Sequence, residues 1–135
     1  MTPSASEQSL IEAFTSITDL HERLNVIVAS CSGVGIPPGE RRDADLVPGC
    51  VSRVWLTGAV KDGVLRLQWD ADSPLVKGLA GLICRVYDET IPTDAAAHRT
   101  RVLSGLRLDG QLSPTRLNGL EMTARRIQLL AAGLS

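Results

Sequence analysis

One cysteine of this chain stands where a thiol could react with another molecule. Cys50 directly follows Pro48 and Gly49 and precedes a run of strand-forming residues. Proline fixes φ and glycine permits φ > 0, so this pair predicts a sharp turn with Cys50 at its rim. A thiol there can meet the sulfur of another protein and attack it as a thiolate. The alternative is a small buried hydrophobic residue, which is what many free cysteines are.

The other two cysteines have weaker patterns. Cys31 falls at the end of an expected helix and before a glycine-rich loop, where it either fills space or acts as a resolving thiol for Cys50. Cys84 lies in the widest apolar stripe of the chain, which favours core packing. Three cysteines without a repeated spacing argue against a disulfide framework. We therefore expect a protein of the reducing cytosol.

A metal site is the next chemistry to consider, because His21 and His98 add two potential ligands to the cysteines. Structural zinc sites usually contain close pairs such as Cys-x-x-Cys, and this sequence has none. We expect both histidines to be solvated helix residues and expect no metal ligands.

Composition limits the class of protein. The 135 residues fit one domain, 1–135, in which residues 1–3 are expected to form a loose tail. Hydrophobic residues make up 44% and aromatic residues 3%, so the core must be mainly aliphatic. The net charge of -1, without a long run of one sign, argues against a nucleic-acid partner. No apolar run approaches the ~20 residues of a membrane span, and the start of the chain does not resemble a signal peptide.

Two strands should follow the cysteine. Residues 51–60 and 64–70 are rich in strand-forming side chains. Between them, Asp62-Gly63 is typical of a two-residue hairpin turn with φ > 0 at both positions. Apolar and polar residues alternate from 65 to 70, so one face of the hairpin is expected to be buried and the other exposed to solvent.

Helices should surround this hairpin. Capping patterns and apolar spacing predict helix starts at Ser4–Glu7, Thr18–Asp19, Ser73–Pro74, Pro92 and Ser113–Pro114. The last helix is expected to end at Gly133. Since a lone hairpin is not stable, the helices that begin at 74 and 114 should cover its apolar face. The result is an α+β fold in which a small antiparallel sheet packs against helices.

Two details of these helices are also predicted. Arg23 should lie on the polar side of the second helix. Gly78 and Gly81 weaken the helix that begins at Ser73–Pro74, by about 1 kcal/mol each relative to Ala. Close packing of this helix against the sheet would explain both glycines.

Three separated segments together resemble one known family. Residues 47–56 (VPGCVSRVWL) resemble the cysteine turn of the SufE family of sulfur acceptors, 72–79 (DSPLVKGL) resemble its helix start after the hairpin, and 112–120 (LSPTRLNGL) resemble its C-terminal signature. The match extends from about Asp19 to about Ala131. The position after the cysteine, often Gln in the family, is Val51 here.

The resemblance implies persulfide transfer. Family members accept sulfur from a pyridoxal-phosphate-dependent cysteine desulfurase, stimulate that enzyme and pass the sulfur to iron–sulfur cluster assembly. Cys50 matches the family's acceptor cysteine, and Arg116 matches an arginine linked to desulfurase engagement. The pyridoxal phosphate belongs to the partner, so this chain is expected to need no cofactor of its own.

Further residues are candidates for supporting the site. Gly49 and Ser52 flank Cys50, and Asp72 and Asn118 are expected to brace the turn beneath it. Arg116 falls in the first turn of a helix, where the dipole disfavours a cation, so a partner's carboxylate is a better explanation for it than helix stability. With Arg53, it is also a cation that could help to form the thiolate in a complex.

Other functions remain open from the sequence. An exposed cysteine can be a ligand in a metal or iron–sulfur cluster scaffold. It can also be incidental in a module that only binds another protein. A thiol enzyme that acts alone is disfavoured, because no His or Asp is recognisably placed as a base for Cys50.

Overall fold

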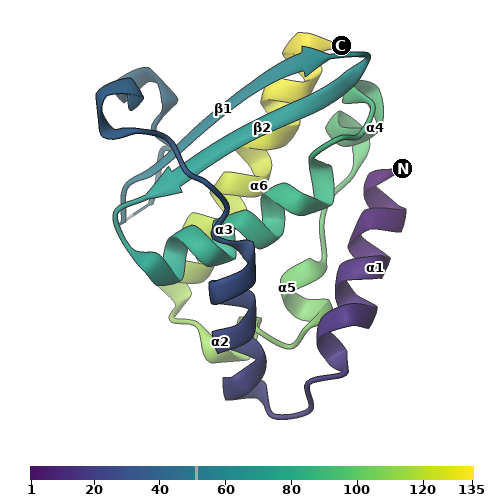
Figure 1. The fold of residues 1–135 in the computed structure, drawn as a ribbon, viewed down its shortest axis with the longest axis vertical. Helices are drawn as coiled ribbons and strands as arrows, with labels where there is room; N and C mark the ends of the chain where they lie inside the picture. The colour runs from purple at the N-terminus through teal and green to yellow at the C-terminus, as the bar shows by residue number, and fades with distance from the viewer. Residues whose placement is uncertain (51) are drawn as a thin grey trace.

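The elements follow one another as two helices, a hairpin and four further helices (Figure 1). The computed structural model describes residues 1–50 and 52–135. The α-helices are α1 (Pro3–Thr15), α2 (Leu20–Cys31), α3 (Pro74–Tyr87), α4 (Pro92–Ala97), α5 (Val102–Gly105) and α6 (Pro114–Leu134), and the strands are β1 (Val54–Lys61) and β2 (Val64–Ala71). Short 3-10 turns span Pro38–Glu40, Asp43–Asp45 and Asp109–Gln111. The fold is α+β, as predicted.

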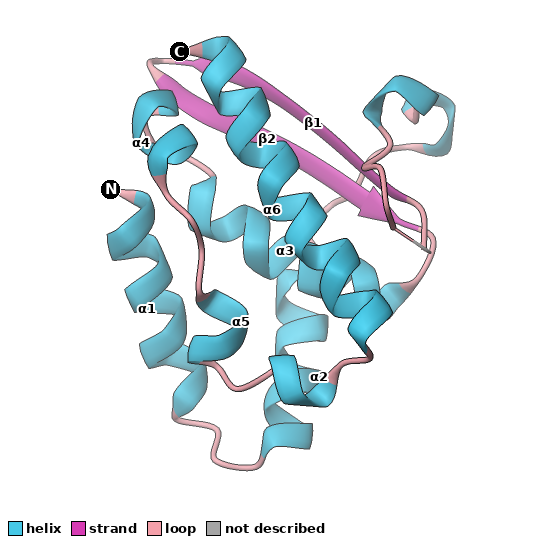
Figure 2. Cartoon of the chain, turned by 180° about the vertical axis from the view of Figure 1, so that it is seen from behind, coloured by secondary structure: helices cyan, strands magenta, loops and turns pink. Residues whose placement is uncertain are grey.

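The sheet packs against two helices that lie far apart in the sequence. α3 contacts β2, α6 contacts β1, and the two helices contact each other beneath the hairpin. Figure 2 shows α6 running along the hairpin, with α3 beside it. α1 and α2 pack on α3 away from the sheet. The core between these elements is mainly Leu, Ile and Val, as the low aromatic content required.

The hairpin turn is as predicted, and the strand bounds differ slightly. Asp62 and Gly63 have φ of 54° and 78°, and Lys61 pairs with Val64 across the two-residue turn. β1 begins at Val54 rather than at 51, and Ser52 and Arg53 belong to the cysteine loop. Val51 itself lies outside the described residues.

Side-chain caps start the predicted helices. In each case an oxygen of the cap accepts a hydrogen bond from a backbone N–H three residues later: Asp19 from Glu22 (2.9 Å), Ser73 from Val76 (3.4 Å) and Ser113 from Arg116 (3.2 Å). The last helix continues through Gly133 to Leu134, one residue beyond the expected end.

The N-terminal prediction was wrong in its details. α1 begins at Pro3, which is buried, so the expected tail of residues 1–3 does not include Pro3. The cap is Thr2, whose hydroxyl accepts from Ala5 N at 3.1 Å, instead of Ser4. Proline at the first helical position has the φ that a helix requires and lacks an N–H that would need a partner. Glu7, expected to complete a capping box, bonds to the loop after α4 instead.

Gly78 and Gly81 do permit close packing, mainly against α2, and Gly81 also faces the sheet, where a Cβ would lie 2.9 Å from Nε1 of Trp69 on β2. A Cβ on Gly78 would lie 2.5 Å from the Cα of Val28. A Cβ on Gly81 would lie 1.7 Å from the carbonyl oxygen of Cys31. The two helix backbones therefore approach too closely for any side chain at these positions.

Arg23 is buried, contrary to the expectation of a polar face. Its guanidinium donates to the carbonyl oxygens of Ile17 (2.9 Å), Leu106 (2.8 Å) and Thr15 (3.4 Å). These carbonyls lie at the end of α1, in the α1–α2 loop and at the end of α5. The guanidinium thus links three segments through hydrogen bonds. The periodicity of one helix does not predict such contacts with other segments.

A buried carboxylate fixes the loop that leads to the cysteine turn. Asp70 on β2 accepts from the backbone N–H of Ile36 (2.8 Å) and pairs with Arg41 (2.9 Å) and Lys77 (3.5 Å). Arg41 also stacks on the ring of Trp55 at 4.9 Å. Burial alone would raise the pKa of Asp70, but the backbone donors and the two cations outweigh it, so its pKa lies below 3.8.

This network predicts a specific dependence of stability on pH. Because the folded-state pKa is depressed, Asp70 stabilises the fold above the unfolded value of 3.8, and this contribution is lost as pH falls through the folded pKa. Asp70→Asn should lower the free energy of unfolding by about 2 kcal/mol at pH 7. The difference from the wild type, measured by urea unfolding, should shrink below pH 4. A difference that stays constant down to pH 2 would contradict the assignment.

Candidate functional site

The cysteine turn is held at both ends by backbone hydrogen bonds. Val47 N donates to Val54 O at 2.8 Å, and Asp72 N donates to Arg53 O at 3.1 Å. Gly49 has φ of +82°, so the turn before Cys50 does require the glycine that the sequence supplies. Ordered anchors thus flank a short loop that carries the thiol.

The thiol of Cys50 is half-buried and points at helix α6. Its Sγ donates to the carbonyl oxygen of Gly119 at 3.3 Å, and the hydroxyl of Thr123 donates to the same oxygen at 2.9 Å. A Cβ on Gly119 would lie 3.3 Å from Sγ, so the glycine gives the sulfur room to approach the helix. The cysteine at the rim of the turn therefore faces inward in the free protein.

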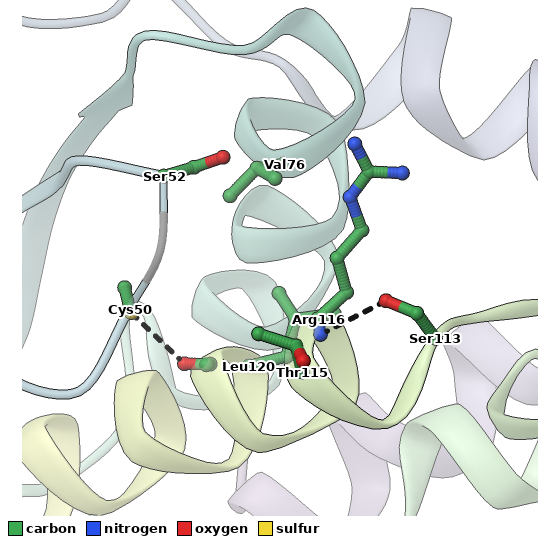
Figure 3. A pocket seen from close by; sticks show the side chains of 8 residues that line it. Cys50, Ser52, Val76, Ser113, Thr115, Arg116 and Leu120 are labelled. Atoms are coloured by element: carbon green, nitrogen blue, oxygen red, sulfur yellow. Dashed lines mark hydrogen bonds between the residues drawn. The ribbon is translucent and has the colours of Figure 1, made fainter.

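A pocket of about 250 Å³ lies beside this sulfur (Figure 3). Its lining comes from the cysteine loop, the start of α3 and the first two turns of α6: Cys50, Ser52, Val76, Ser113, Thr115, Arg116, Gly119 and Leu120. In Figure 3, Cys50 and the Arg116 guanidinium lie on opposite sides of the pocket, with Val76 between them. Two residues that are 66 apart in sequence thus share one cavity.

Other predicted site residues lie elsewhere. Asp72 and Asn118 are exposed, and their side chains make no hydrogen bond within residues 1–50 and 52–135. The backbone N–H of Asp72 contacts the cysteine loop at Arg53 O, and a bracing role of the Asp72 and Asn118 side chains stays a prediction. Arg53 is exposed and does not line the pocket.

Sequence reasoning did not identify Gly119 and Thr123 as neighbours of the sulfur. Helical spacing contained the signal, because positions 116, 119, 120 and 123 lie on one face of α6. Arg116 was itself predicted from sequence, and a helix places the residues three, four and seven positions later on the same face.

The environment disfavours the thiolate in the free protein. Burial raises the pKa of Cys50 above its ordinary value of 9.0, and the neighbouring Thr123 hydroxyl opposes this only in part. The thiol is therefore protonated at neutral pH and a poor nucleophile until its surroundings change.

This geometry predicts the reactivity of Cys50 toward a small alkylating reagent. The rate with iodoacetamide should still be rising above pH 9.0, because the folded pKa lies above that value. Gly119→Ala should push the sulfur outward by a few tenths of an ångström, lower its pKa and increase the rate at pH 7 about threefold. Gly133→Ala, whose added methyl meets nothing within 4 Å, is the control. Equal rates in both variants would mean that Gly119 does not control the thiol.

The other cysteines are not placed to assist Cys50. Cys31 is buried at the end of α2, where its sulfur accepts a hydrogen bond from Arg85 at 3.4 Å. Cys84 is fully buried in α3, and burial raises its pKa far above 9.0. Both fit the core-packing interpretation.

The described part of the chain contains neither a cluster of potential metal ligands nor a helix that could span a membrane. No group of three or more His, Cys, Asp or Glu residues there could hold a metal ion. Within the same residues, none of the helices has the length and apolar character needed to cross a membrane.

Comparison with known proteins identifies the class. Residues 8–131 match the model of the family described as SufE: Fe-S metabolism associated domain. A solved structure described as the solution structure of a hypothetical protein from Thermus thermophilus is also similar, with a TM-score of 0.78 and 26% identity over 99% of this chain and 98% of that one. The chain is thus an α+β protein with a role in iron–sulfur metabolism. This chain belongs to the SufE family.

Proposed function

We propose that this protein accepts sulfur on Cys50 from a pyridoxal-phosphate-dependent cysteine desulfurase and relays it to iron–sulfur cluster assembly. The observation that carries the proposal is the shared pocket of Cys50 and Arg116 in a chain of the SufE family. The three free cysteines suit a reducing compartment, and we place the activity in the cytoplasm.

The reaction is an exchange between thiols without net oxidation. The Cys50 thiolate attacks the terminal sulfur of a persulfide on the donor's cysteine. A bond forms between Cys50 Sγ and that sulfur, while the bond to the donor's own cysteine breaks and its electron pair leaves with the donor thiolate. The proton released from Cys50 restores the donor thiol. Attack by a downstream acceptor on the Cys50 persulfide repeats the same step.

The pocket provides two things that this chemistry needs. Its space beside Sγ can take one further sulfur atom, and its largely aliphatic wall at Val76 and Leu120 limits the access of water. The protonated thiol of the free protein avoids indiscriminate reaction, because the thiolate is the reactive form. Docking of the donor would then expose Cys50 or bring a cation near it.

The direct test is sulfur uptake by the wild-type protein. Incubation with a purified cysteine desulfurase of the same organism and free cysteine should add the mass of one sulfur atom. Peptide mapping should place that atom on the Cys50 peptide. No adduct, or an adduct on Cys31 or Cys84, would contradict the proposal.

Arg116 is proposed to pair with a carboxylate of the desulfurase. It is exposed and forms no ion pair with a carboxylate among the described residues, and only its backbone N–H is used, by the Ser113 cap. Arg116→Ala should therefore weaken binding about tenfold and reduce stimulation of the desulfurase, with little loss of stability. A titration of desulfurase activity with the variant measures this. Identical half-saturation for wild type and variant would remove Arg116 from the interface.

A further inference from the structure

A second hollow lies on the other flank of α6. It encloses about 730 Å³ between the first half of α6 and the segment that joins α4 to α5. Figure 2 shows this segment running alongside α6. We name the hollow the arginine groove, after three of its lining residues, Arg99, Arg101 and Arg125.

The groove has an apolar floor and a charged rim. Ile83, Leu103, Leu120 and Ala124 are buried and form the floor together with the half-buried Leu117. The three arginines are exposed, and Asp109 and Glu121 also reach the rim. Such a combination suits a protein segment with an apolar anchor and charged flanks better than a small ligand.

The backbone that carries two of the arginines is firmly held. Glu7 of α1 accepts hydrogen bonds from the backbone N–H of Arg101 (2.8 Å) and from the hydroxyl of Thr100. Buried Tyr87 donates to the carbonyl oxygen of His98 (2.7 Å) and accepts from Thr100 N (3.2 Å). Arg99 and Arg101 therefore project from a segment that is ordered before any partner arrives, which lowers the entropy cost of binding.

The three arginines of the groove form no close ion pairs within the described residues. Among residues 1–50 and 52–135, none of the three arginines lies within 4.0 Å of a carboxylate oxygen. This holds even for Arg125, which follows Glu121 by one helical turn. Guanidinium groups pair well with carboxylates through two parallel hydrogen bonds. Against Asp109 and Glu121, the three arginines leave one net positive charge on the lining, which favours an acidic segment.

The groove and the thiol pocket lie next to each other along α6. Leu120 lines both cavities. Arg116 lines the pocket, and the next residue of α6, Leu117, lines the groove. A protein docked at Cys50 would therefore reach the groove along the same helix.

We infer that the arginine groove binds an acidic segment with an apolar anchor that belongs to the desulfurase delivering sulfur to Cys50. This inference rests on the proposed function and adds a second contact site, outside the pocket. The contact involves no covalent step. It sets affinity and the rate of encounter, leaving the sulfur exchange itself to Cys50.

The test compares two charge reversals of equal size. Arg99→Glu with Arg101→Glu changes the groove, and Arg42→Glu with Lys61→Glu changes exposed residues that do not line it. The Kd for a purified desulfurase of the same organism, measured by fluorescence anisotropy at several salt concentrations, should rise about tenfold or more in the groove variant only. Its salt dependence should also weaken.

Two further measurements separate this inference from the proposed function. Sulfur uptake by the groove variant at saturating desulfurase should equal that of the wild type, because Cys50 and its pocket are unchanged. Arg125→Glu, on α6, repeats the test without altering the loop held by Glu7. If neither groove variant weakens binding more than the control, the inference is overturned even when the wild type takes up sulfur. A wild type that binds the desulfurase but takes up no sulfur rejects the proposed function alone.

Discussion

Cys50→Ser should take up no sulfur from the desulfurase, whereas the wild type gains one atom. A serine hydroxyl can keep the hydrogen bond to the carbonyl oxygen of Gly119, so the loop and the fold should be preserved. It cannot form a persulfide, because the exchange requires a sulfur nucleophile. We expect the loss to exceed about a hundredfold in the amount of labelled protein, since no other group can replace the nucleophile.

Cys31→Ser is the matched control for this experiment. Its hydroxyl can accept the hydrogen bond that the Arg85 guanidinium now gives to sulfur, and Cys31 is buried and does not line the pocket. This variant should take up sulfur as the wild type does. If Cys50→Ser takes up as much sulfur as the wild type, Cys50 is not the acceptor. If Cys31→Ser keeps its fold but takes up no sulfur, the assignment to Cys50 is likewise contradicted.

Gly81→Ala should be the most destabilising single methyl addition in this chain. The new Cβ would stand 1.7 Å from the carbonyl oxygen of Cys31 and 2.8 Å from its carbonyl carbon. Both are backbone atoms of α2, so no side-chain rotation can relieve the overlap and the helices must separate. We expect the free energy of unfolding to fall by about 3 kcal/mol or more, measured by urea denaturation.

Gly133→Ala tests whether the effect comes from packing or from helix propensity. Gly133 also lies in a helix, but its added Cβ meets nothing within 4 Å. Alanine there should leave stability unchanged or raise it by up to about 1 kcal/mol. If both glycine variants changed stability equally, the close approach of α2 and α3 would not be the reason for Gly81.

Local rules made much of the fold predictable from sequence. The Asp62-Gly63 turn needs two positive φ values, and Ser73, Asp19 and Ser113 cap helices through backbone N–H groups three residues away. Each signal acts within a few residues, where sequence and geometry are directly coupled. The exception was the N-terminus, where Thr2 and Pro3 competed with a capping box at Ser4 and Glu7.

The sequence by itself determined that Cys50 follows a sharp turn and that Arg116 begins a helix, since proline, glycine and a serine cap impose those conformations locally. The tertiary structure alone decided that Gly119 lies under the sulfur, 69 positions along the chain, and that the thiol faces inward. It likewise buried Arg23 and placed Gly81 against α2. The physical reason is that contacts between distant segments depend on how helices and sheet pack as whole bodies, which no periodicity within one segment encodes.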